Sequence, residues 1–191
     1  VQTCALPISY RSIRTNIQYI DPSPGSKSIL VTSNAPGEGK TFTTINLGAI
    51  LAKAGKKTII LELDMHKPRV QKALEMNPDK GISSIIIGKD GIEDSIKPTL
   101  VENLFVLLSG PIPPNPSDMI LSDKLAEIFE FVKSRYDYVL IDTPPAGLIS
   151  DALLLMRFSS INLFVVNPKF ATTSIIRNTE NLVHEIGRAH V

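Results

Sequence analysis

The hydrophobic residues of this chain gather in short continuous runs, separated by amphipathic or polar segments. Apolar runs rich in β-branched residues predict strands at residues 28–32, 57–63, 103–108, 137–141 and 161–166. Periodic apolar positions predict helices at residues 10–19, about 40–54, 123–133 and 172–185. Because the strand runs do not alternate with polar residues, they are typical of a parallel sheet that is buried on both faces. The pattern therefore predicts an α/β fold of three layers, with a mostly parallel central sheet and helices on both faces.

Length and composition are those of one ordinary globular domain. The chain has 191 residues, of which 43% are hydrophobic and 20% charged, and its net charge is +1. This near-neutral balance argues against a nucleic-acid partner. No apolar run approaches the ~20 residues that a membrane helix needs, so we expect this piece to be soluble. A single cysteine excludes an internal disulfide framework and fits a reducing, cytosolic setting.

The two ends of the chain differ from the rest. The segments VQTCALPI and IGRAHV can be encoded by one DNA segment read on opposite strands, which is similar to a common sequencing adapter. We therefore interpret residues 1–8 and 186–191 as non-native, and residues 9–185 as one ATP-binding domain truncated at both ends. Natural termini are the alternative, which resequencing of the genomic locus would distinguish.

The segment from Ser33 to Thr41 has the sequence context of a phosphate-binding P-loop, because it joins a buried strand to a helix. Glycines allow the backbone to curl so that its N–H groups, with the helix N-terminus, hold phosphate oxygens. Lys40 then reaches the outer phosphates, and the Thr41 hydroxyl ligates Mg²⁺. Asn34 stands where the first glycine of the usual pattern would be, which makes this the deviant form of the loop. The predicted ATP-binding residues here are Ala35, Pro36, Gly37, Glu38, Gly39, Lys40, Thr41 and Phe42.

Acidic residues end two of the predicted strands. Glu62 and Asp64 are two residues apart and so point the same way, while Asp142 ends a strand in the manner of a Walker B motif. Ligands bind at the carboxyl edge of open parallel sheets, so the sequence predicts a magnesium site there. Its predicted ligands are Thr41, Glu62, Asp64 and Asp142. Solvated strand ends, helix caps or a turn-starting aspartate are the alternative interpretation of these acids, and His66, Lys67 and Arg69 are read as solvated charges.

Four segments together resemble the bacterial tyrosine kinases (BY-kinases), the cytoplasmic kinase domains of capsule and exopolysaccharide biosynthesis. They are the loop at 33–41, the ELDMHKP segment at 62–68, the GPIPPNPS segment at 110–117 and the DTPP segment at 142–145. The resemblance implies a P-loop NTPase fold and a Mg²⁺- and ATP-dependent autokinase that acts on tyrosine. It also implies catalytic roles for Lys40, Asp64 and Asp142.

The resemblance further implies partners. The family forms ring-like oligomers through a helix with a Glu-x-x-Arg-x-x-Arg pattern, and Arg11 and Arg14 match its arginines. Besides ATP and further copies of the chain, it implies a membrane-embedded polysaccharide co-polymerase or activator segment, fused or separate. The expected location is the cytoplasmic face of the bacterial plasma membrane.

Three departures from the family pattern affect these expectations. Glu62 replaces the usual aspartate, which lengthens the side chain by one methylene and could move a ligand by ~1 Å. His66 stands where arginine is usual. Ile8 stands where the oligomerisation pattern has Glu, but it lies inside the suspected adapter segment. Separately, only four tyrosines are present and none are clustered, so the family's tyrosine-rich acceptor tail is expected to lie outside this chain.

The predicted reaction transfers a phosphoryl group from ATP to a tyrosine of a neighbouring subunit's tail. Asp64 would orient the tyrosine hydroxyl or accept its proton, and Asn167 is predicted to touch the adenine. Two alternatives stay open: a partitioning or division-site ATPase, and a non-catalytic nucleotide-gated regulator of chain length. The first class usually carries a signature lysine where this chain has Ala35. ATP hydrolysis without tyrosine labelling would favour it, and ATP binding without turnover would favour the second.

Overall fold

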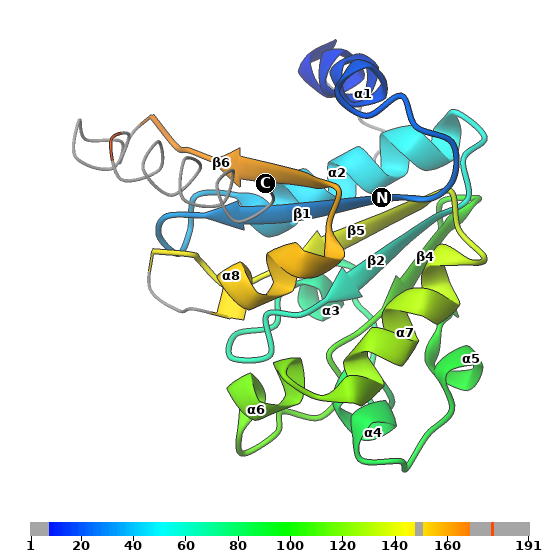
Figure 1. Cartoon of the computed structure of the whole chain (residues 1–191), viewed down its shortest axis with the longest axis vertical. Coiled ribbons are helices and arrows are strands. Elements are labelled where there is room, and N and C mark those ends of the chain that lie inside the picture. Colours follow the sequence, from blue (N-terminus) through cyan, green and yellow to red (C-terminus); the bar gives the residue numbers. More distant parts are fainter. Residues whose placement is uncertain (1–7, 148–150, 169–176, 178–191) are drawn as a thin grey trace.

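The computed structural model describes residues 8–147, 151–168 and 177 of the chain. Its strands form one six-stranded sheet in the order β3-β4-β2-β5-β1-β6 (Figure 1). All neighbouring pairs are parallel except β3 and β4, which are antiparallel. The strands are β1 Lys27–Ser33, β2 Thr58–Glu62, β3 Lys97–Pro98, β4 Leu104–Leu107, β5 Tyr138–Asp142 and β6 Ile161–Val165. The predicted mostly parallel sheet is therefore confirmed.

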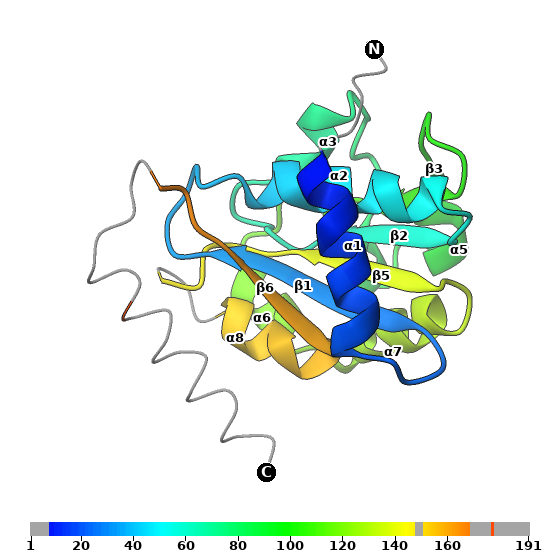
Figure 2. The same ribbon diagram turned by 90° about the horizontal axis from the view of Figure 1, so that it is seen from above.

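Helices cover both faces of this sheet, as a three-layer fold requires. The helices are α1 Ile8–Ile20, α2 Lys40–Lys53, α3 Val70–Ala73, α4 Ile82–Ile86, α5 Ile92–Ser95, α6 Pro116–Ile120, α7 Asp123–Lys133, α8 Asp151–Leu155 and the 3₁₀ helix η1 Met156–Phe158. One buried cluster joins the sheet to α1, α2 and α3, and another joins it to α4, α6, α7 and α8. Figure 1 shows α1 at the top and α4, α6 and α7 at the bottom, and Figure 2 shows α1 crossing the strands.

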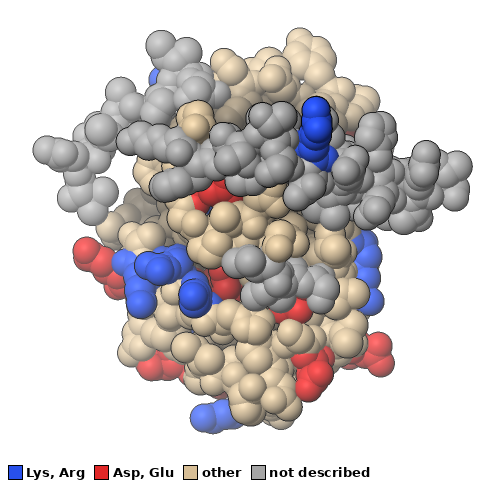
Figure 3. Space-filling model, turned by 90° about the vertical axis from the view of Figure 1, so that its left-hand side faces the viewer, with Lys and Arg blue, Asp and Glu red and all other residues tan. Residues whose placement is uncertain are grey.

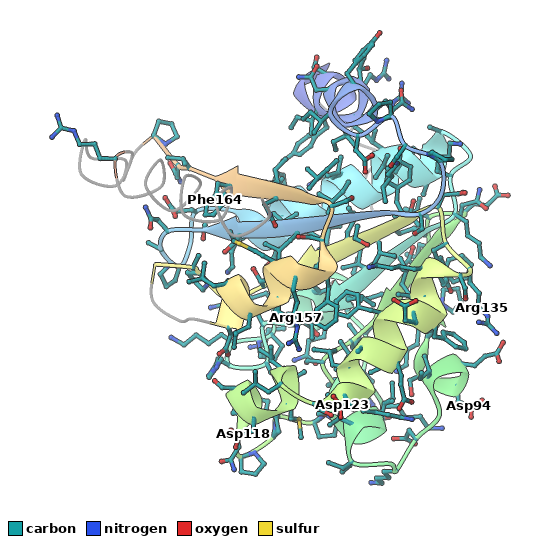
Figure 4. All side chains as sticks on the ribbon, in the orientation of Figure 1. Asp94, Asp118, Asp123, Arg135, Arg157 and Phe164 are labelled. Atoms are coloured by element: carbon teal, nitrogen blue, oxygen red, sulfur yellow. The ribbon has the colours of Figure 1, made fainter. Side chains whose placement is uncertain are left out.

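Two contacts show how tightly these layers pack. Gly48 of α2 faces the sheet so closely that a Cβ atom there would lie 3.1 Å from side-chain carbons of both Leu104 and Leu140. On the other face, the rings of Phe129 and Phe158 stack with centroids 4.2 Å apart. Arg157 donates a hydrogen bond to the Ile120 carbonyl and so ties η1 to the end of α6 (Figure 4).

Within the described part of the chain, no helix is both long and apolar enough to cross a bilayer.

The long helices and strands predicted within the described residues agree with the structure, and the short helices were missed. Helix α7 has the predicted bounds, and α2 ends one residue before the predicted end, with Gly55 at a φ of 79° just beyond it. Prolines in a helix interior or a central strand are disfavoured, so the proline-rich sequence at residues 110–116 predicts a stiff loop, yet Pro116 is the first residue of α6, a position that needs no N–H donor. The helix predicted at residues 172–185 lies outside the described residues, apart from residue 177.

Candidate functional site

The loop between β1 and α2 is curled in the way that the sequence predicts. Gly37 has a φ of 86° and Gly39, the N-cap of α2, a φ of 100°. Both angles lie in the left-handed region, which costs a residue with a Cβ atom about 1–2 kcal/mol. Two glycines in this short loop therefore make its turn possible and place it at the N-terminus of a 14-residue helix.

Two loop residues predicted to bind ATP also stabilise the loop internally. The backbone N–H of Ala35 donates to Glu38 Oε2 at 2.7 Å, and Ser33 Oγ donates to the Ala35 carbonyl at 2.7 Å. Glu38 is only 4% exposed. These bonds hold the first half of the loop before any ligand binds.

Asn34, which replaces the first glycine of the usual pattern, lies against the segment that follows β5. A Cβ atom added to Gly147 would lie 2.5 Å from the Asn34 backbone oxygen and 2.7 Å from its Oδ1 atom. Such distances require the backbone to shift, so glycine at 147 is what allows the two segments to approach. Thr32 contributes to the same junction by donating to the Pro144 carbonyl at 3.0 Å.

The residues predicted to act on phosphate and metal converge at the start of α2. Lys40 Nζ lies 3.5 Å from Asp64 Oδ2, and both side chains are less than 10% exposed. Thr41 Oγ1 donates to Asp142 Oδ2 at 2.9 Å, and Thr44 Oγ1 lies 3.4 Å from Asp142 Oδ1. The fold therefore brings one cation and two hydroxyls at the start of α2 together with two carboxylates, at positions 64 and 142, that lie far from them in the sequence.

Asp142 is fully buried, and its surroundings favour the neutral acid. Burial raises the pKa of Asp142 to about 7, against the lowering influence of Lys40 and Thr41. The nearby carboxylates of Asp64 and Glu62 raise this pKa further. Glu62 is the direct partner of Asp142 across the β2–β5 pair, so the two side chains leave the sheet on the same face. A divalent cation here would compensate charge that the protein alone leaves partly uncompensated.

Glu62 lies in a different environment from the one expected for a metal ligand. Its Oε1 atom accepts the N–H groups of Val70 and Gln71 at 2.7 and 3.3 Å. Its Oε2 atom accepts the N–H and the hydroxyl of Ser109, both at 3.1 Å. Direct metal ligation by Glu62 stays a prediction that this arrangement does not favour.

A cavity of about 340 Å³ opens beside the loop. Its lining residues are Pro36, Gly37, Gly39, Lys40, Thr41, Phe42, Asp64, His66, Lys67, Arg69, Pro144 and Pro145. The strands end at this side of the molecule, which faces the viewer in Figure 3, where Lys and Arg side chains gather beside acidic ones. By contrast, Asp118 and Asp123 lie in the first turns of α6 and α7, on the side opposite α1 (Figure 4).

The cavity contains three residues that sequence reasoning treated as solvated charges. His66, Lys67 and Arg69 all line it. His66 Nε2 lies 3.1 Å from Asp151 Oδ2, which also accepts the Ser117 hydroxyl at 3.1 Å. Asp151 is 2% exposed, whereas His66 and Ser117 are exposed, so a buried carboxylate here holds two residues of the surface. Its members lie 34 to 85 residues apart, and no local signal in the sequence marks them as neighbours.

The remaining predicted residues occupy the periphery. Phe42 is 64% exposed and its ring meets Tyr10 of α1 edge-on, with centroids 6.4 Å apart. Arg11 is exposed and Arg14 half-buried, one helical turn apart on α1. Asn167 follows β6 by two residues and is absent from the described lining of the cavity. The roles of these residues in oligomerisation and adenine binding stay predictions.

The oxygen atoms of this site suit a magnesium ion that is bound partly by the protein and partly by the phosphates of a nucleotide. Among the described residues, no three His, Cys, Asp or Glu side chains gather as a metal site of their own. Mg²⁺ is usually held by one or two carboxylates together with substrate phosphates and water. Thr41 and Asp142, with Asp64 nearby, meet that requirement beside a phosphate-binding loop.

Comparison with known proteins decides the family. Residues 26–188 match the family model described as an AAA domain. The tyrosine-protein kinase YwqD of Bacillus subtilis is 35% identical over 158 residues, which cover 83% of this chain and 67% of that protein. This chain belongs to the family of bacterial tyrosine-protein kinases. The chimerical protein CapA2B2 has a crystal structure that matches with a TM-score of 0.90 at 37% identity, covering 97% of this chain and 83% of that one.

The kinase family shares its P-loop fold with other nucleotide-binding proteins. The septum site-determining protein MinD from Pyrococcus horikoshii, solved in complex with Mg-ADP, matches with a TM-score of 0.72 at 27% identity. The match covers 86% of this chain and 66% of that chain. The fold is thus one that binds nucleotide and magnesium in general. The match to the kinase structure extends over 97% of this chain.

Proposed function

We propose that this chain is the ATP-binding core of a protein-tyrosine autokinase that regulates capsular or exopolysaccharide synthesis and export. One observation carries the proposal: the curled loop, the Lys40–Asp64 ion pair and the Thr41–Asp142 hydrogen bond border one site. Membership of the tyrosine-kinase family supports tyrosine as the acceptor.

In the proposed reaction, the loop N–H groups and Lys40 bind the β- and γ-phosphates of ATP. Mg²⁺, held by Thr41 and Asp142, supplies charge neutralisation when it is bound. The tyrosine oxygen forms a bond to the γ-phosphorus while the bond to the β–γ bridging oxygen breaks, and ADP leaves. Asp64 orients the hydroxyl and accepts its proton, since its Oδ2 atom lies beside the phosphate-binding lysine.

Asp64 is held in place for this role by a second contact. Its Oδ1 atom accepts the N–H of Lys67 at 3.0 Å, while Oδ2 faces Lys40. A carboxylate fixed at both oxygens loses little freedom when the acceptor binds, which favours the transfer step. We assign the acceptor to a neighbouring copy of the chain, with α1 and its Arg11 and Arg14 at the contact between copies.

The proposal places the kinase at the cytoplasmic face of the bacterial plasma membrane, next to a membrane-embedded activator or co-polymerase segment. Co-purification of the protein from its complete reading frame with a membrane fraction would support this location. Recovery only from the soluble fraction, with the neighbouring polysaccharide genes expressed, would contradict it.

The test of the activity uses the protein from its complete reading frame and ATP labelled at the γ-phosphate. We expect label on tyrosine, abolished by Lys40→Met and retained by Lys53→Met, which removes an exposed lysine from the same helix. Label that persists in Lys40→Met would contradict the proposal.

A second candidate is an ATPase of the partitioning or division-site class. The MinD likeness favours it, while Ala35 in place of the signature lysine does not. Hydrolysis of ATP by the complete protein, with no label on tyrosine, would establish this function instead.

A further inference from the structure

Glu62 has the most fully occupied carboxylate among the acids of the site. It ends β2, is 0% exposed and accepts four hydrogen bonds, two at each oxygen. An ionised carboxylate has about four lone-pair sites, so the donors of Val70, Gln71 and Ser109 fill its capacity. Neither a metal ion nor a metal-bound water reaches either oxygen unless one of these donors is displaced.

Displacement of those donors would be costly. Three of the four are groups on the backbone, and each would be left in the interior without the acceptor that it has now. A buried N–H that loses its partner costs more than an ordinary hydrogen bond gains. The arrangement therefore favours a Glu62 that binds protein and not metal.

The four bonds hold together three segments of the fold. Val70 and Gln71 begin α3, so their bonds close the loop of residues 63–69 onto the strand from which it starts. Ser109 follows β4 and begins the proline-rich segment, so its bonds attach that segment to β2. The closed loop carries Asp64, His66, Lys67 and Arg69, which form one wall of the cavity.

The same two loops are joined a second time, farther along. Ser117, at the end of the proline-rich segment, and His66, in the closed loop, both contact Asp151 Oδ2. The cavity wall is thus attached at its base through Glu62 and at its rim through Asp151. Both attachments lie two residues from Asp64, Glu62 before it and His66 after it, but only Glu62 accepts backbone N–H groups from both loops.

We propose that Glu62 is a positioning residue for phosphoryl transfer, which closes the 63–69 loop and so holds Asp64 against Lys40, and that it is not a ligand of the metal. The part of this inference that concerns phosphoryl transfer rests on the proposed kinase function. The closure itself is independent of that function, because it concerns bonds within the chain.

The first test needs neither nucleotide nor metal. Amide hydrogen exchange is measured at Val70, Gln71 and Ser109 in the metal-free protein, in the wild type and in Glu62→Gln and Glu62→Asp. Glutamine replaces one acceptor atom with a donor, and aspartate withdraws the carboxylate by one methylene. We expect exchange at these amides to be at least about tenfold faster in both variants, as the loss of a hydrogen bond to a charged group implies. Unchanged exchange in both would overturn the closure.

The control is Glu127→Gln, which removes an exposed carboxylate from α7 that pairs only with Lys124 within the described residues. If the Glu62 variants prove too unstable to purify, Ser109→Ala removes one of the four donors and leaves the backbone intact. The backbone N–H at position 109 keeps its bond to Glu62, but the carboxylate is then held by three donors in place of four, so exchange at Val70, Gln71 and position 109 should be faster than in the wild type. No change at any of these three amides would count against the closure.

The second test separates positioning from ligation. With the complete protein, we expect Glu62→Gln to lower kcat for tyrosine phosphorylation by at least about tenfold, since misplacement by ~1 Å can cost far more. The KM for ATP and the Mg²⁺ concentration for half-maximal activity should stay within about twofold of the wild type. A tenfold rise in the Mg²⁺ requirement would identify Glu62 as a ligand and overturn the inference. Wild-type protein that never labels tyrosine would overturn the proposed function, while the exchange result would still decide the closure.

Discussion

Replacement of Asp142 by asparagine keeps the shape of this buried side chain and removes its ability to ionise. In the folded protein, burial is the largest influence that raises the pKa of Asp142 to about 7, from a usual value of 3.8. Thr41 and Thr44 remain beside the new amide, and their hydroxyls can rotate to accept from it. The substitution therefore tests the electrostatic cost of this carboxyl group with little change in packing.

The free energy of unfolding changes with pH because the Asp142 carboxyl group loses its proton at a lower pH in the unfolded chain than in the folded protein. Below pH 3.8 the carboxyl group is protonated in both states, and its contribution to stability is fully present. Between that pH and about 7 the unfolded chain ionises while the folded protein keeps its proton, so the free energy of unfolding falls as pH rises. A pKa difference of one corresponds to about 1.4 kcal/mol, so the whole difference amounts to about 4 kcal/mol. Between pH 5 and pH 8 we expect about 2.5 kcal/mol of this loss.

The assay is urea unfolding of the metal-free protein at several pH values from 5 to 8, in buffers with a chelator. Wild-type protein should lose stability across this range by about 2.5 kcal/mol more than Asp142→Asn does. Asp118→Asn, which alters an exposed carboxyl on α6, serves as the control and should follow the wild type. The same pH slope in wild type and Asp142→Asn would refute the reasoning.

Three further substitutions test the packing and the local geometry. Phe129→Ala removes a fully buried ring that stacks on Phe158 and should lower the free energy of unfolding by about 3–5 kcal/mol, measured by urea denaturation. Ser122→Ala removes the hydroxyl that accepts the Lys124 N–H at the start of α7 and should cost about 1 kcal/mol in the same assay. Gly147→Ala places a Cβ atom against Asn34 and should cost about 1–3 kcal/mol and weaken ATP binding measured by calorimetry. Surface substitutions usually change the free energy of unfolding by less than about 0.5 kcal/mol. A change that small in any one of these variants would contradict the contact that it removes or disturbs.

The elements that could be predicted from the sequence are those whose signal lies within one short stretch of the chain and those long enough to show a helical period. The five parallel strands are continuous apolar runs, and the loop carries its glycines and Lys40 in adjacent positions, so both signals lie within one short window. The carboxyl ends of parallel strands meet at one edge of the sheet, which is why Asp64 and Asp142 could be placed near the loop. Helices α4, α5 and α8 have only four or five residues, too few for a helical period to appear.

The environment of Glu62 could not be predicted in the same way. Its spacing from Asp64 places both acids on one face of the strand, but it does not indicate which hydrogen-bond donors surround Glu62 in the fold. The Ser109 hydroxyl and N–H come from 47 residues away, and the α3 N–H groups depend on the path of a loop without periodicity. The His66–Asp151–Ser117 contact was missed for the same reason, because it joins the 63–69 loop to the starts of α6 and α8, which only the finished fold brings together.

Calorimetric titration with ATP in the presence and absence of Mg²⁺ tests the central claim most directly. The account predicts saturable binding of about one nucleotide per chain, strengthened by Mg²⁺ and lost in Lys40→Met. Correctly folded wild-type protein that takes up no magnesium-nucleotide would contradict it.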